Sequence, residues 1–204
     1  MKRITSLIVA VLSAALVSSV FAAPEVGQAA PDFTLTDIGG KSHSLSAFKG
    51  KTVVIEWVNP ECPFVKKHYD KSGNMQATQK AAIADGVVWL SINSAAPGKE
   101  GDFDKGQVES WLKRVGAAPT AYFRDQDGKV GKLYDARTTP HMFVINPQGT
   151  LVYAGGIDDI RSANPDDIAK ATNYVKAALA DLKAGKDVQT KTSRPYGCSV
   201  KYAD

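Results

Sequence analysis

The sequence predicts an α/β protein in which a mixed β-sheet lies between layers of helices. Two runs of β-branched and other apolar residues, at 52–58 and 87–93, have the length and composition of buried strands. A segment with helical character follows each run. A later pair of strand-like runs surrounds the turn at 146–149, which predicts a β-hairpin. Strands that alternate with helices and end in a hairpin predict both parallel and antiparallel pairs.

The first 22 residues have the three marks of a secretory signal peptide. The start MKR is basic, the run from Ile4 to Val20 is apolar or small, and Val20 and Ala22 suit the positions three and one before a cleavage site. An uncleaved membrane anchor is the alternative, but the run barely reaches the ~20 residues that a span needs. We expect a periplasmic or secreted protein that begins at Ala23 and is not stably inserted in a membrane.

The remaining chain has the size of one domain, expected over residues 23–185, followed by a polar tail over 186–204. The formal net charge of the whole chain is +4, and Lys2 and Arg3 supply two of these charges. Because no basic run is interleaved with aromatic residues, nucleic acid is not an expected partner. Two cysteines are too few for a disulfide-stapled framework, although a disulfide persists outside the cytoplasm.

Two short strands are expected before the first buried strand. Phe33 and Leu35 alternate with polar residues, and the pair Gly39 and Gly40 predicts a turn. A second short strand follows this turn and is itself followed by another turn. These elements predict an N-terminal β extension of the fold.

Two helical regions are expected on either side of the second buried strand. The first begins at Pro63, is interrupted at 72–74 and stops before Gly86. The second begins after Asp104, because Asp104 and Gln107 have the spacing of a capping box. The apolar residues behind this cap recur at helical spacing: Val108, Trp111, Leu112 and Val115.

A closing amphipathic helix is the clearest helix of the sequence. A short strand at 121–123, a short helix within 129–136 and the hairpin precede it. Asn164 is its expected N-cap, Pro165 lies in its first turn, and Gly185 follows its end. One apolar stripe marks the buried face: Ile168, Ala171, Val175, Ala178, Leu179 and Leu182.

The stretch WVNPECP, at 57–63, ends a buried strand and places Cys62 directly before a helix, and Thr139-Pro140 later opens the hairpin. Together with the closing helix, these features resemble the thioredoxin fold. The Cys-Pro-Phe-Val motif and the N-terminal β extension resemble its peroxiredoxin-like branch, the AhpC/TSA group. The resemblance covers Phe33 to about Leu182. It implies a three-layer α/β fold and a thiol-dependent oxidoreductase without organic cofactor or metal, reduced by another thiol protein.

Cys62 is the expected nucleophile. A cysteine before a helix lies near unpaired backbone N–H groups and the positive end of the helix dipole, which stabilise a thiolate. A thiolate attacks disulfides and peroxides, whereas a thiol hardly does. The alternative is an inert buried cysteine.

The resemblance assigns roles to three further residues. It implies a cis peptide bond before Pro140, where the backbone of Thr139 can pair with a bound thiol substrate. Glu56 precedes Cys62 by six positions, the spacing of the buried acidic residue that helps to move protons in thioredoxin-like proteins. Glu56 would then act as a general base. An outward-facing Glu56 paired with a lysine is the alternative.

The sequence also departs from both groups that it resembles. Val65 stands where thioredoxins carry their second cysteine, so Cys62 cannot be resolved within a short motif. Asn59 stands where peroxiredoxins carry Thr or Ser; it could donate a hydrogen bond to a peroxide oxygen but could not shuttle a proton. No activating arginine can be assigned from the sequence, and the candidates are Arg124, Arg137 and Arg194.

Cys198 in the tail is the expected resolving thiol, in the manner of the C-terminal resolving cysteines of some peroxiredoxins. A permanent bridge between Cys62 and Cys198, and no pairing at all, remain alternatives. The substrate would be a peroxide or a protein disulfide.

A copper carrier without turnover is the second class of function. His141 follows Pro140, and Met142, His68 and Cys198 could be in reach, since sulfur and imidazole suit copper(I). Such carriers usually pair two cysteines within one short motif, which this chain lacks. His68 is more simply expected to be a surface or partly buried residue.

Overall fold

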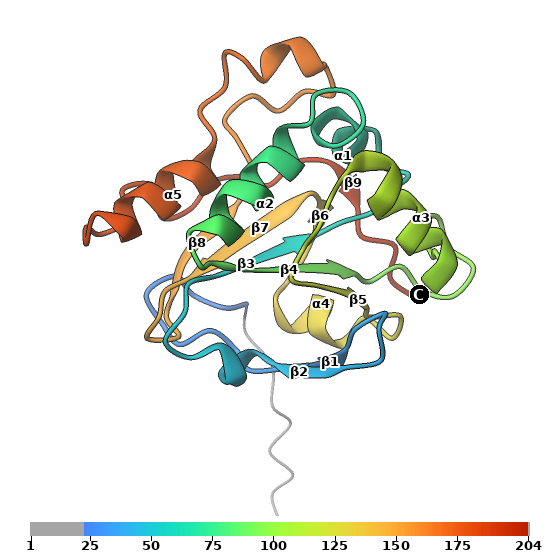
Figure 1. Ribbon diagram of the computed structural model, residues 1–204, viewed down its shortest axis with the longest axis horizontal. Helices are drawn as coiled ribbons and strands as arrows, with labels where there is room; N and C mark the ends of the chain where they lie inside the picture. Colours follow the sequence, from blue (N-terminus) through green and yellow to red (C-terminus); the bar gives the residue numbers. More distant parts are fainter. Residues whose placement is uncertain (1–22, 204) are drawn as a thin grey trace, which may run out of the picture.

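The computed structural model describes residues 23–203, and a five-stranded mixed sheet forms its centre (Figure 1). The predicted signal peptide at 1–22 lies outside the described residues. β3 (Val53–Trp57), β4 and β5 run parallel to one another, whereas β7 (His141–Ile145) is antiparallel to both of its neighbours, β3 and β8. The mixed sheet and the hairpin are therefore confirmed. The strand order is β5 (Ala121–Arg124), β4 (Val88–Asn93), β3 (Val53–Trp57), β7 (His141–Ile145) and β8 (Leu151–Gly155).

Helices cover one face of this sheet (Figure 1). In the described part of the chain they are α1 (Pro63–His68), α2 (Asn74–Ala84), α3 (Lys105–Val115) and α5 (Tyr174–Lys183). Within residues 23–203, every helix is too short or too polar to span a bilayer. The helices and this face of the sheet share one hydrophobic cluster, which includes Val54, Val65, Met75, Trp89, Val108, Trp111, Val175 and Ala178.

The opposite face is covered by α4 (Lys129–Leu133), the 3-10 helix η1 (Leu45–Phe48) and a hairpin of β1 (Thr34–Thr36) and β2 (Ser42–Ser44). This hairpin is a separate two-stranded sheet that lies below the central sheet in Figure 1. The three layers and the N-terminal β extension are thus confirmed. The cluster on this side includes Phe33, Leu45, Ile55, Trp57, Val130, Tyr134 and Phe143.

Local signals in the sequence set the ends of the helices around β4. Gly73, with a φ of +66°, precedes α2 and separates it from α1. The N–H of Gln107 donates to Asp104 Oδ1 at 2.8 Å, and the N–H of Asp104 donates to Gln107 Oε1 at 2.8 Å. The interruption and the capping box are therefore confirmed.

The closing helix corrects the prediction of one continuous helix from Pro165. Asn164 caps only the 3-10 turn η2 (Pro165–Asp167), and α5 begins at Tyr174 with Asn173 as its N-cap. Val175 and Ala178 of the predicted stripe are buried in the core, whereas the earlier positions lie outside any helix or are only half-buried.

The predicted helix is interrupted because residues 172–174 bond to the loop after β8. The N–H of Thr172 donates to Asp159 Oδ1 at 2.8 Å, and the N–H of Tyr174 donates to the Ile157 carbonyl at 3.0 Å. These partners replace the carbonyls four residues earlier that a helix would use. A contact between distant segments therefore overrides a strong local pattern.

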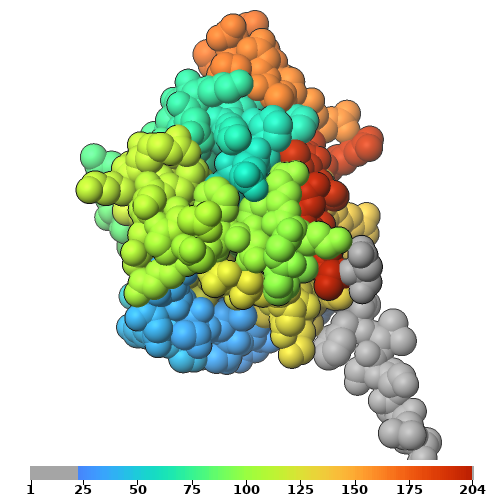
Figure 2. All heavy atoms as spheres, turned by 90° about the vertical axis from the view of Figure 1, so that its right-hand side faces the viewer, coloured from blue at the N-terminus to red at the C-terminus, as the bar shows by residue number. Residues whose placement is uncertain are grey.

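The predicted polar tail lies against the body of the domain. Val188 and Tyr196 are buried, and β9 (Cys198–Ser199) pairs antiparallel with β6 (Thr138–Thr139). Figure 2 shows the C-terminal segment in red, bordered by the residues around α1 and by the green segment that leads into α3. The tail thus forms part of the molecular surface next to the N-terminus of α1.

The N-cap of α5 tests where the closing helix begins. Asn173→Ala removes the acceptor of the Lys176 N–H and should lower the free energy of unfolding by ~1 kcal/mol, the usual cost of a lost cap. Asn164→Ala removes the cap of a single 3-10 turn and should cost clearly less. Urea unfolding of both variants measures the difference, and the reverse order would support a helix that begins at Pro165.

Candidate active site

Two free cysteine sulfurs meet at the N-terminus of α1. Cys62 is the N-cap of this helix and is fully buried. Its Sγ donates to the carbonyl of Thr139 at 3.1 Å and lies 2.8 Å from Cys198 Sγ. The structure therefore brings together the two cysteines that the sequence places 136 positions apart.

The pairing of β6 with β9 positions the sulfur of Cys198. Thr139 stands opposite Cys198, and Thr138 stands opposite Ser199. Gly197 has a φ of +140°, and a Cβ at this residue would overlap the carbonyl oxygen of Thr139. Only glycine allows the tail to approach Thr139 this closely.

The peptide bond between Thr139 and Pro140 is cis, as the resemblance implies. Thr139 is buried, and its carbonyl faces the sulfur of Cys62. The backbone position at which a thiol substrate was expected to pair is therefore occupied by the chain's own Cys198.

The protonation of Cys198 is shifted by its surroundings. Burial, and then the neighbouring Cys62 sulfur and the carboxylate of Glu100, raise the pKa of the Cys198 thiol to about 12, against the opposing charge of Lys201. Cys198 is therefore a thiol at neutral pH.

Glu56 is fully buried on the helix-covered side of β3, so the outward-facing alternative is wrong. Its carboxylate accepts hydrogen bonds from Tyr69 Oη at 2.8 Å and Trp89 Nε1 at 2.9 Å, and from Gln79 and Ser91 at 3.3 Å. Burial raises the pKa of Glu56 to about 7, although the four donors oppose this rise. Glu56 can thus exchange a proton near neutral pH.

Asn59 connects the start of α1 to the loop before α3. Its Nδ2 donates to the carbonyl and to Oε1 of Glu100, at 3.3 and 3.2 Å, and its Oδ1 accepts from the Glu61 N–H at 2.9 Å. Glu61 in turn accepts from the Gly101 N–H at 2.6 Å. Since both ends of the Asn59 amide have partners, this geometry favours a positioning role over contact with a peroxide.

None of the three candidate arginines donates to either sulfur in the described residues. Arg124 pairs with Asp102 at 3.0 Å, Arg137 pairs with Asp135 at 2.5 Å, and Arg194 is exposed. The arginine-activated thiol of the resemblance is therefore not assembled here.

The histidines do not converge on the sulfurs. Nδ1 of His141 accepts from the Arg137 N–H at 3.3 Å, and its ring packs on Phe143 with centroids 4.4 Å apart. His68 is fully buried, so its expected surface or partly buried position is wrong. Residues 23–203 contain no group of three His, Cys, Asp or Glu side chains that could hold a metal ion.

A second buried polar cluster, which sequence reasoning missed, lies on this side of the sheet. Lys67 and His68 of α1 meet Asp158, which follows β8, and Tyr196 of the tail. All four are buried. No spacing in the sequence connects these positions, because they come from three separate parts of the chain: α1, the loop after β8 and the tail.

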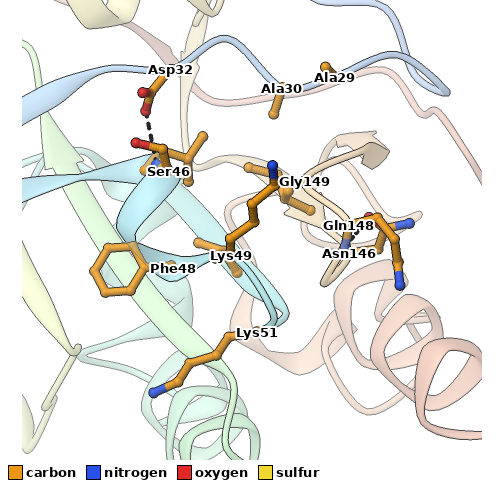
Figure 3. Close-up of a pocket in the computed structure, with 13 residues that line it drawn as sticks. Ala29, Ala30, Asp32, Ser46, Phe48, Lys49, Lys51, Asn146, Gln148 and Gly149 are labelled. Carbon is orange, nitrogen blue, oxygen red and sulfur yellow. Dashed lines mark hydrogen bonds between the residues drawn. The ribbon is translucent and has the colours of Figure 1, made fainter.

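A separate hollow lies on the opposite side of the domain (Figure 3). It is lined by the lead-in at 29–32, by η1 with Lys49 and Lys51, and by the turn between β7 and β8. Asp32 Oδ1 accepts from the Ser46 N–H at 2.9 Å beside it. Neither cysteine lines this hollow, so the sulfur chemistry belongs to the N-terminus of α1.

Known proteins resemble this chain in sequence and in fold. The AhpC/TSA family pattern matches residues 26–154. The thiol-disulfide oxidoreductase ResA of Bacillus subtilis (strain 168) is 29% identical over 148 residues, which cover 71% of this chain and 76% of that protein. The crystal structure of a hypothetical protein from Sinorhizobium meliloti 1021 is 26% identical, with a TM-score of 0.74 over 89% of this chain and 97% of that one.

A more distant solved structure bears on the fold alone. The putative thiol:disulfide interchange protein DsbE from Chlorobium tepidum is 23% identical, with a TM-score of 0.54 over 77% of this chain and 99% of that one. Together these likenesses confirm the thioredoxin-like fold that the sequence predicts.

Glu56 should make the stability of the fold depend on pH. The folded chain holds the proton of Glu56 up to about pH 7, whereas a free glutamate releases it near 4.5. Folded chains therefore bind more protons between these values, and the free energy of unfolding falls as the pH rises through this window. The fall should be on the order of 3 kcal/mol, since one unit of pKa corresponds to ~1.4 kcal/mol.

Glu56→Gln removes this titration while keeping an oxygen that can accept from Trp89 or Tyr69. Urea unfolding at either end of the window should show a much smaller pH dependence for the variant than for the wild type. Equal pH dependence in the two proteins would contradict a titrating Glu56.

Gly197 tests whether the tail needs its close approach to Thr139. Gly197→Ala should displace the tail, so that iodoacetamide alkylates Cys198 at least about tenfold faster, because 1–2 kcal/mol of backbone strain alone corresponds to this factor. Gly185→Ala is the matched control, since Gly185 also has a positive φ, of +68°, but open space around it. Mass spectrometry of the alkylated peptides gives both rates, and equal rates would count against the close packing.

Proposed function

The chain belongs to the AhpC/TSA family and is a redoxin of the thiol-disulfide oxidoreductase class, and from this premise we propose that Cys62 exchanges disulfides with protein substrates while Cys198 resolves the intermediate. One observation carries the proposal. Two free thiols lie 2.8 Å apart beside a cis-proline, with Cys62 at the N-terminus of a helix.

The first step forms a mixed disulfide. The Cys62 thiolate attacks one sulfur of the substrate disulfide, the substrate S–S bond breaks, and the other substrate sulfur leaves as a thiolate. Cys62 is the N-cap of α1, beside the unpaired backbone N–H groups of its first turn. Cys198 does not compete, because its pKa is raised to about 12.

The second step releases the reduced substrate. Once Cys62 is part of a mixed disulfide, its sulfur no longer carries the charge that helps to raise the pKa of Cys198. Cys198 then gives its proton to the first substrate thiolate or to water and attacks the Cys62 sulfur. The second substrate sulfur leaves as a thiolate, and a disulfide joins Cys62 to Cys198. A dithiol protein supplies two electrons and two protons to restore both thiols.

The remaining site residues support these steps in the proposal. Thr139 and Pro140 form the shelf on which a substrate thiol pairs, in the place that Cys198 occupies in the free protein. Glu56 relays protons, since its pKa of about 7 lets it both take and give a proton at neutral pH. Asn59 holds the loop at 100–101 over the start of α1.

A peroxide is a second substrate class that one observation favours. Cys62 has no exposed surface beneath the tail, so a small peroxide needs less movement of the tail than a protein does. The Cys62 thiolate would attack one peroxide oxygen and become a sulfenic acid as the O–O bond breaks and the other oxygen leaves as hydroxide or alkoxide. Cys198 would then displace water from this sulfenic acid and form the same disulfide.

Export is part of the proposal and is supported by the sequence of residues 1–22. Removal of this segment would leave the domain at 23–185 with its tail at 186–204. The electron donor would then be a thiol protein of the same compartment. The mass of the protein recovered outside the cytoplasm tests this point, and an uncleaved chain there would contradict it.

Serine variants test the two cysteine roles separately. With a disulfide-bonded protein such as insulin as probe, Cys62→Ser should lose turnover by at least about a thousandfold, because the hydroxyl is a poor nucleophile without a general base. Cys198→Ser should accumulate a mixed disulfide between Cys62 and the probe, seen by intact mass. Full turnover of Cys62→Ser would overturn the proposal, and full turnover of Cys198→Ser would overturn the resolving role.

One equivalent of hydrogen peroxide separates the substrate classes. If peroxide is a substrate, the wild type rapidly loses two hydrogens in mass and Cys198→Ser gains one oxygen at Cys62. If neither mass changes while insulin is still reduced, the peroxide branch is wrong and the disulfide branch stands.

A further inference from the structure

A buried polar cluster ties the helix that carries Cys62 to the tail that carries Cys198. Lys67 and His68 lie at the end of α1, Asp158 follows β8, and Tyr196 precedes Cys198 by two residues. Their exposed fractions are 0, 0, 2 and 7%. Polar and charged groups at this depth are costly unless they bond to one another, so their contacts decide where Tyr196 lies.

Tyr196 stands in the middle of a chain of hydrogen bonds. Asn74 Nδ2 donates to His68 Nδ1 at 3.0 Å, which places the proton of the neutral imidazole on Nε2. His68 Nε2 then donates to the Tyr196 hydroxyl at 3.2 Å, and this hydroxyl donates to Asp158 Oδ1 at 2.5 Å. Each donor therefore has one acceptor, and the hydroxyl of Tyr196 both accepts a hydrogen bond from His68 and donates one to Asp158.

The protonation states fit this direction of donation. Burial, and then the charge of Lys67, lower the pKa of His68 to about 3, so its imidazole is neutral. Burial and the adjacent Asp158 carboxylate raise the pKa of Tyr196 above its usual range, so its hydroxyl keeps the proton that it donates.

The ring of Tyr196 is also fixed by α1. Lys67 Nζ lies 5.6 Å above the ring centroid, 3.8 Å from Asp158 Oδ2 and 3.3 Å from the Ile160 carbonyl. Phe64 meets the same ring edge to face, with centroids 5.8 Å apart. The side chain of Tyr196 is thus attached to the helix after Cys62, and only Gly197 separates Tyr196 from Cys198 in the tail.

We propose that Tyr196 is a positioning residue, whose hydroxyl, held by Asp158 and His68, keeps the Cys198 sulfur opposite Cys62. This role rests on the proposed function, because it concerns the step in which Cys198 resolves Cys62. In the described residues, the hydroxyl of Tyr196 bonds to His68 and Asp158 and not to either sulfur. It acts by raising the effective concentration of Cys198 at Cys62, and so favours the disulfide between them.

A second tail tyrosine provides the matched control. Tyr202 lies four residues after Cys198, and its hydroxyl donates to the Ala136 carbonyl at 2.8 Å. Its acceptor is a neutral carbonyl, whereas Tyr196 donates to a buried carboxylate. Hydrogen bonds to charged groups are the stronger class. Tyr196→Phe and Tyr202→Phe therefore remove the same atom from the same tail but should differ in effect.

The equilibrium of the full chain with reduced and oxidised glutathione measures this effect. Thiol trapping and intact mass give the ratio of the Cys62–Cys198 disulfide to the dithiol. Tyr196→Phe should lower the equilibrium constant for the disulfide by about tenfold, the factor expected for one charge-assisted hydrogen bond. Tyr202→Phe should lower it by less than about threefold. Equal constants for the wild type and Tyr196→Phe, or equal losses in the two variants, would overturn the proposal.

Thermal unfolding of the reduced proteins separates positioning from stability. A merely structural role would lower the Tm of Tyr196→Phe and leave the glutathione equilibrium unchanged, which would also overturn the proposal. His68→Leu covers the case in which Tyr196→Phe fails to fold. It removes the group that donates to the Tyr196 hydroxyl and puts an apolar side chain of similar size in its place. It should lower the equilibrium constant in the same direction, and an unchanged constant would contradict the proposal.

The wild type distinguishes this proposal from the proposed function. If the wild type forms no disulfide between Cys62 and Cys198 at any glutathione ratio, the resolving step itself is wrong. If the disulfide forms in the wild type and with the same constant in Tyr196→Phe, only the role of Tyr196 is wrong.

Discussion

The antiparallel pairing of β6 with β9 is the contact on which the sulfur site depends. Each strand has two residues, and the register places Cys198 directly opposite Thr139. So short a pairing is weak by itself, because a strand pair gains stability from its side-chain contacts as much as from its ladder. The buried side chain of Tyr196 supplies such a contact, and the absence of a side chain at Gly197 lets the two backbones approach closely. The site is therefore completed by the tail and does not exist in the domain alone.

The helix-covered face of the sheet contains two buried carboxylates in different surroundings. Glu56 is bonded only by neutral donors, which hold its position and leave its charge to depend on pH. Asp158 lies beside Lys67 and accepts from Tyr196. Apolar residues could fill either site, but they would not fix the orientation of the neighbouring elements. The first carboxylate joins β3 to β4 and α2, and the second joins α1 to the tail.

Features set by neighbours in sequence could be predicted, and features set by distant contacts could not. The capping box of Asp104 and Gln107 needs only its own four residues, so the sequence contains all of its information. The start of α5 depends on the bond from Tyr174 to the loop after β8, which no helical pattern records. The sequence does not predict on which side of β3 Glu56 lies, because this strand is apolar on both faces. His68 is buried by a tail 128 positions away.

The separation of the two cysteines along the chain links the redox state to folding. A bond between residues 136 positions apart closes the chain from α1 to the tail into one loop, and such a closure removes up to ~5 kcal/mol of conformational freedom from the unfolded chain. In a thermodynamic cycle the same free energy appears twice. The oxidised domain resists unfolding by the amount by which the folded domain resists reduction. In the proposed redox cycle, the reductant therefore has to overcome part of the folding free energy, and any agent that loosens the fold also makes the proposed disulfide easier to reduce.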